Sequence, residues 1–101
     1  MTAYGEFSGG KLIFYFSGEL DESNIRVAAA ELDGKIAENP TAVILDFSEL
    51  SFIDSTGIGM LLARYGRLKK AGIPLYARGL KGQTEKVFRM SGLLGIINVL
   101  R

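Results

Sequence analysis

The order of periodic segments along the chain predicts an α/β domain with a mostly parallel sheet. The 101 residues are the length of one domain, expected over residues 1–101. Two short strand-like segments open the chain, and apolar runs then alternate with helical repeats in the order ββαβαβαβ. Strands separated by helices pair in parallel, whereas strands joined by a tight turn pair antiparallel. We therefore expect four to five strands, three helices and an antiparallel N-terminal edge hairpin.

The first two strands are predicted over residues 3–7 and 11–17. Gly9 and Gly10 stand between them, and a two-glycine link supplies the positive φ angles of a tight hairpin turn. One face of the second strand carries large apolar side chains, namely Leu12, Phe14 and Phe16. Residues 18–21 are expected to form a loop, with Asp21 capping the helix that follows.

The first helix is predicted from apolar residues spaced by three and four positions: Ile25, Ala29, Leu32 and Ile36. It should end at Asn39, because a residue that precedes a proline avoids the α region. The next segment, residues 41–47, contains four consecutive apolar residues and is typical of a strand buried on both faces.

The second helix is expected to begin at Ser55 or Thr56 and to end before Gly72. On a projection at 100° per residue, one arc should face the sheet, formed by Ile58, Leu61, Leu62, Tyr65 and Leu68. Met60 falls opposite, beside Arg64, and is expected to be exposed. Gly59, Ala63 and Gly66 form a strip with almost no side chains, which fits either close packing of the first helix or contact with a partner.

The last elements are a short strand over residues 73–77, a helix over 83–90 and a strand over 96–100. Pro74 belongs near the start of its strand or at an edge, because proline cannot donate a hydrogen bond to the sheet. Gly92 marks the end of the third helix.

Composition removes several functional classes. The chain has no cysteine and no histidine, so disulfides, thiolate chemistry, the commonest general base and the commonest metal ligand are absent. A net charge of +1 does not favour nucleic acid. No apolar run approaches the roughly 18–20 residues that cross a bilayer, and the first residues do not resemble a signal peptide. We expect a cytoplasmic protein with no metal, cofactor or membrane partner.

The most informative stretch is residues 50–62, where a strand end leads into a helix that starts with two hydroxyl residues. Ser55 or Thr56 could simply cap this helix. Glycines inside the helix, however, each cost about 0.8–1 kcal/mol relative to alanine, so Gly57 and Gly59 call for a steric reason. A helix N-terminus also favours an anion. Asp54, and Asp21 from the neighbouring strand, are expected near the same hydroxyls.

Three segments resemble the STAS-domain anti-sigma factor antagonists, bacterial regulators of sporulation and stress sigma factors. Residues 54–59, Asp-Ser-Thr-Gly-Ile-Gly, are similar to that family's D-S-[ST]-G-[LI]-G signature. Residues 18–21 resemble its G-E-L-D loop, and residues 87–93 resemble its V-x-x-x-F-x-x-S-G-L region with a slightly shorter spacing. The resemblance implies a STAS-like fold and phosphorylation of the first hydroxyl after the aspartate, which is Ser55.

The resemblance also implies the partners. The unphosphorylated protein would bind an anti-sigma factor that is itself a serine kinase, supplying the ATP, and would so release the sigma factor. A separate serine phosphatase would reset the switch. The residues expected to contact the kinase are Asp21, Asp54, Thr56, Gly57, Gly59, Met60 and Arg64.

Two alternatives remain open on the sequence. A STAS domain could serve as a subunit of a transporter or a signalling scaffold. An enzyme that uses Ser55 as a nucleophile would need a lysine, carboxylate or tyrosine as its base, since histidine is absent. We expect a binding protein that is not an enzyme.

Overall fold

The computed structural model describes residues 1–100, and residue 101, the last of the expected domain, lies outside the described residues. These residues form a five-stranded sheet in the order β1-β2-β3-β4-β5, with β1 antiparallel and the other strands parallel. The elements are β1 (Thr2–Ser8), β2 (Lys11–Leu20), α1 (Ile25–Ile36), β3 (Ala42–Ile53), α2 (Ser55–Lys70), β4 (Leu75–Arg78), α3 (Gly82–Met90), a 3-10 turn (Leu93–Gly95) and β5 (Asn98–Leu100). This arrangement confirms the predicted fold class.

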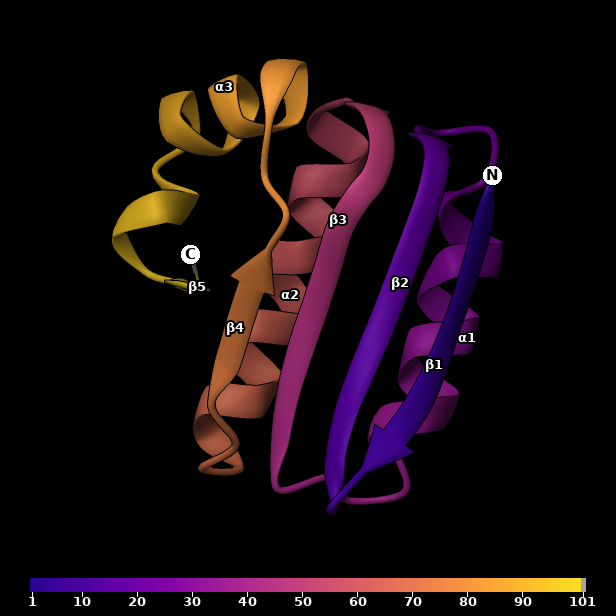
Figure 1. Ribbon diagram of the computed structural model, residues 1–101, viewed down its shortest axis with the longest axis vertical. Helices are drawn as coiled ribbons and strands as arrows, with labels where there is room; N and C mark the ends of the chain where they lie inside the picture. Colours follow the sequence, from indigo (N-terminus) through magenta and orange to yellow (C-terminus); the bar gives the residue numbers. More distant parts are fainter. Residues whose placement is uncertain (101) are drawn as a thin grey trace.

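The core lies between the sheet and its helices. In Figure 1, α1 and α2 lie behind the sheet, and α3 lies beside the end of β3. A chain of aromatic contacts crosses this core: the ring centroids of Phe16 and Phe47 are 5.4 Å apart, and those of Phe47 and Phe88 are 5.1 Å apart. These rings, each at most 1% exposed, connect β2 and β3 to α3. Aromatic packing therefore places α3 next to β3.

Two strands run further than the sequence predicted. Residues 18–20, expected to be a loop, continue β2, and β3 extends to Ile53 rather than ending near residue 47. Gly18 takes a φ of +87° within a stretch where the pairing of β2 with β3 shifts register. Beyond Asp46, β3 has no β4 residue on its other side. The part of β3 after Asp46 therefore lacks the continuous apolar run of a strand buried on both faces, so the sequence did not mark it as strand.

The helix-free face of the sheet carries a polar network. Arg78 Nε donates to Asp46 Oδ2 at 2.7 Å, and Asp46 Oδ1 accepts from Ser48 N and Ser48 Oγ at 2.9 and 2.6 Å. Burial by itself raises the pKa of Asp46, but the hydrogen bonds from Ser48 and Arg78 outweigh it and hold this pKa below its ordinary value. The network joins β3 to β4.

The second helix is turned differently from the prediction. Met60 is 6% exposed and belongs to the core, whereas Leu62, expected to face the sheet, is 41% exposed. The reason is that α2 packs against α1 as well as the sheet: Arg64 Nη2 donates to Asp33 Oδ2 of α1 at 2.7 Å. The prediction of an exposed Met60 was therefore wrong, because a single-face projection omits the neighbouring helix.

Candidate functional site

Two aspartates, Asp21 and Asp54, directly follow neighbouring strands at the same edge of the sheet. Leu20 pairs with Ile53 across β2 and β3, and Asp54 N donates to Leu20 O at 3.3 Å. Asp21 and Asp54 directly follow these paired residues, so both stand at the carboxyl ends of neighbouring parallel strands. This is where open α/β sheets place their sites. The backbone pairing therefore brings the Asp21 and Asp54 positions side by side where α2 begins.

Asp54, rather than a hydroxyl residue, caps α2. Its backbone is extended, and its Oδ1 accepts from Gly57 N at 3.1 Å. Ser55 is therefore the first helical residue, and both Ser55 and Thr56 are exposed. Within residues 1–100, neither hydroxyl makes a hydrogen bond. The simple capping interpretation of Ser55 and Thr56 is thus wrong, and the Ser55 hydroxyl is accessible beside a helix N-terminus.

Asp21 has a different role from the predicted one. Its Oδ1 accepts from Ser23 N at 2.9 Å and from Ser23 Oγ at 2.5 Å, which closes a turn and lowers the pKa of Asp21 below its ordinary value. Asn24 stands at the start of α1, and its side chain accepts from Asp21 N and donates to Glu19 O. Asp21 therefore does not cap α1, and its carboxylate is held in the turn that precedes the helix.

The glycines of α2 have different surroundings. A Cβ on Gly57 would lie 2.6 Å from Ile53 Cγ1 and 3.1 Å from Ile53 Cδ1, so only a hydrogen fits where the helix starts against β3. The predicted steric reason is confirmed at Gly57. Within residues 1–100, a Cβ built on Gly59 or Gly66 would meet nothing within 4 Å beyond its chain neighbours and the nearby backbone of its own helix. Close packing of α1 therefore does not explain these two glycines.

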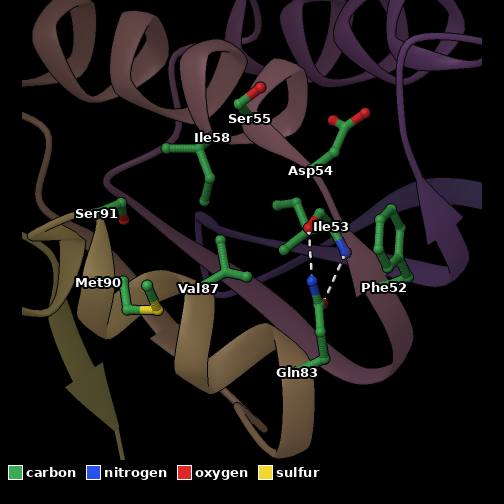
Figure 2. Close-up of a pocket in the computed structure, with 9 residues that line it drawn as sticks. All are labelled: Phe52, Ile53, Asp54, Ser55, Ile58, Gln83, Val87, Met90 and Ser91. Atoms are coloured by element: carbon green, nitrogen blue, oxygen red, sulfur yellow. Dashed lines mark hydrogen bonds between the residues drawn. The ribbon is translucent and has the colours of Figure 1, made fainter.

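Gln83 holds the end of β3 from the side that β4 leaves free. Its Nε2 donates to Ile53 O at 3.0 Å, and Ile53 N donates to its Oε1 at 3.1 Å. Figure 2 shows this pair of bonds. Thr84 of the same helix turn donates to Leu50 O at 3.5 Å. The α3 side chains thus replace a neighbouring strand just before Ser55, a contact across thirty positions that the sequence analysis missed.

A groove of about 430 Å³ opens between the start of α2 and α3. Figure 2 shows Ile58 of α2 across from Val87 and Met90 of α3, with Phe52 beside the end of β3. Ser55 and Asp54 also line this groove. Met90 is 77% exposed and Phe52 is 37% exposed. No pattern in the sequence predicted this groove, although residues 87–93, which resemble a family motif, include three of its lining residues.

The expected partner-contact residues divide into two groups. Asp21, Asp54, Thr56 and Gly59 are accessible at or near the start of α2. Gly57, Met60 and Arg64 face inward: Gly57 and Met60 are buried, and the Arg64 side chain is 17% exposed in its ion pair with Asp33. The outward side of α2 instead carries Leu62, which its helical spacing had predicted to face the sheet.

The described residues contain no cluster of three or more side chains of the kinds that hold a metal ion. Over residues 1–100, no helix is long and apolar enough to cross a membrane.

The chain is similar to proteins of one family. A model of the STAS domain matches residues 5–101. The anti-sigma F factor antagonist of Paenibacillus polymyxa is 28% identical over 95 residues, which cover 93% of this chain and 81% of that protein. The anti-sigma factor antagonist SpoIIAA in its unphosphorylated form is 25% identical, with a TM-score of 0.84 over 99% of this chain and 89% of its own. The Bacillus cell fate determinant SpoIIAA in the phosphorylated form is also 25% identical, with a TM-score of 0.76 over 99% of this chain and 92% of its own.

Proposed function

Because the chain belongs to the STAS domain family, we propose that it is an anti-sigma factor antagonist that acts in the cytoplasm by switching partners. Its unphosphorylated form binds an anti-sigma factor that is a serine kinase, and the sigma factor is released. The kinase transfers the γ-phosphoryl group of ATP to the Ser55 hydroxyl, and the complex then separates. A serine phosphatase removes the phosphate and restores binding. In this proposal the chain is a regulatory binding protein with no reaction of its own.

The accessibility of the Ser55 hydroxyl carries this proposal. Because Asp54 caps α2, the Ser55 side chain is not needed to begin the helix and is exposed for a kinase. A relative of this chain, SpoIIAA, is known in phosphorylated and unphosphorylated forms. The relatives that carry the name of anti-sigma factor antagonist support the assignment of the activity to this chain.

A phosphate on Ser55 would meet two opposing effects within the protein. It adds a charge of about −1.5 to −2. The N-terminus of α2 stabilises an anion by roughly 0.3–1 kcal/mol. Asp54 and Asp21 stand at the same edge of the sheet and repel it. Since these effects oppose each other, we expect little refolding. The switch then acts on the docked partner, which would have to desolvate a dianion.

The outward side of α2 supplies the adjoining contact surface. Thr56 and Gly59 are exposed, and Leu62 adds an apolar side chain. The open space at Gly59 lets a partner approach the helix backbone closely. We assign Asp21 and Asp54 to the rim of this surface, where their charges would orient a basic partner.

The experiment is phosphorylation by each purified serine-kinase anti-sigma factor encoded in the source genome, with Mg-ATP. Intact-mass measurement should show one added phosphate on the wild type and on Thr56→Ala, and none on Ser55→Ala. The exposed position of both hydroxyls makes Thr56→Ala a matched control. Labelling of Ser55→Ala at the wild-type level would show that Ser55 is not the phosphorylated residue. An absence of labelling by all of these kinases would refute the proposed function.

A further inference from the structure

We propose that the groove between α2 and α3 receives an apolar side chain of the same kinase that docks at Ser55, an inference that rests on the proposed function. The groove is lined by Ser55 itself and by Phe52, Ile58, Val87 and Met90. It is therefore continuous with the surface where the kinase must bind to reach the hydroxyl.

The walls of the groove offer almost only apolar contact. The amide of Gln83 is occupied on both sides by Ile53, and Ser91 Oγ donates to Phe88 O at 3.1 Å. Asp54 accepts from Gly57 N. Among the described polar side chains that line the groove, Ser55 alone makes no hydrogen bond. The remaining polar partners are the Ser55 hydroxyl and the second carboxylate oxygen of Asp54, both at one end of the lining. An occupant with several polar groups would leave most of them unpaired, so the chemistry favours an apolar one.

The shape of the groove favours a side chain carried by a protein. It lies open on the surface, whereas small-molecule sites bury 70–90% of their ligand. A side chain of a docked kinase would be covered on its remaining side by the kinase. Met90, at 77% exposure, is the most exposed large apolar side chain of the described residues and stands at the groove. Methionine adapts to irregular partner surfaces and is enriched at interfaces.

This occupancy explains how one phosphate affects a wide interface. Ser55 belongs to the wall of an apolar groove, so its phosphorylation places a hydrated dianion beside the inserted side chain. Insertion of the kinase side chain into the groove would then require desolvation of the phosphate. The groove thus makes binding sensitive to the state of Ser55 through an apolar contact.

The test is titration calorimetry with the kinase that labels Ser55, in Mg-ADP so that no phosphoryl transfer occurs. Met90→Asp and Met90→Lys should each weaken binding by about thirtyfold or more, the size of an interface hot spot. Met90→Leu should bind like the wild type. Ile96→Asp is the matched control, because Ile96 is an apolar residue that is 42% exposed and lines a separate small pocket with Lys69 at the far end of α2. It should bind normally.

The outcomes separate the proposals. Loss of binding in Met90→Asp but not in Met90→Lys would show a charge effect and overturn the apolar contact. Wild-type affinity in both variants, with Ser55 still phosphorylated, would overturn the groove and leave the proposed function standing. A change of self-association in Met90→Asp, seen by sedimentation of the protein alone, would assign the groove to a second copy instead. If no kinase labels Ser55, both proposals fall. Thermal melts should be unchanged, since Met90 is mostly exposed.

Discussion

Replacing the glycines of α2 by alanine should have opposite effects at two positions separated by half a turn. At Gly59 a Cβ would meet no described atom within 4 Å beyond its chain neighbours and the nearby helix backbone, so Gly59→Ala should gain the helix propensity of alanine, about 0.8–1 kcal/mol. For a domain of this size, that change raises the melting temperature by about 4–8 °C. Gly66→Ala has the same open surroundings and should behave in the same way.

Gly57→Ala should be destabilising. Its Cβ would approach Ile53 Cγ1 to 2.6 Å, and Ile53 is fully buried, so this side chain cannot turn away into solvent. Overpacking of this kind costs about 1–3 kcal/mol, which exceeds the gain in helix propensity. We expect a net loss of about 1 kcal/mol and a melting temperature lowered by several degrees.

Calorimetric melts of the three variants beside the wild type measure the signs directly, and urea unfolding gives the free energies. The decisive result is the difference between Gly57→Ala and Gly59→Ala, because both place the same methyl group on the same helix. Stabilisation of similar size in both would refute the argument that Gly57 is required by contact with Ile53. The Gly59→Ala protein also tests the outward surface of α2, since weaker kinase binding by this more stable variant would arise at the interface.

Two further predictions concern the groups that join the strands. Asp46→Asn should lower the free energy of unfolding at pH 7 by about 1.5–3 kcal/mol. Because the folded pKa of Asp46 is depressed, its stabilisation is complete above the unfolded pKa of about 3.9 and is lost as the pH falls through the folded pKa. Urea unfolding from pH 7 to 2 should therefore show the gap between wild type and variant closing in acid, and a constant gap would contradict the pairing. Gln83→Ala should lower the free energy of unfolding by about 1–3 kcal/mol, and should speed amide exchange at Ile53. Gln83→Glu keeps only the acceptor, so its free energy of unfolding at pH 7 should also fall. If the Ile53 amide exchanges at the wild-type rate in both variants, Gln83 does not hold the end of β3.

The sequence alone determined the order of the elements and the place of the candidate phosphorylation site. Helix and strand periods are local properties, so the alternation of segments predicted the mostly parallel sheet with its antiparallel edge. The start of α2 was predicted at Ser55 or Thr56 and lies at Ser55, because the hydroxyl and glycine residues that mark it are adjacent in the chain. The family resemblance rested on equally local motifs and is confirmed over residues 5–101.

Only the tertiary structure decided which side chains of each element face the core and which contact one another. Met60 and Leu62 exchange their expected positions because contact with α1 turns α2, and a helix with a broad apolar arc does not specify that turn by itself. Asp54 takes the capping role because the extended end of β3 brings its carboxylate to Gly57. Gln83 and the groove at Ser55 depend on α3 meeting β3 across thirty positions. Such contacts follow from packing of the whole core, and no local pattern in the chain encodes them.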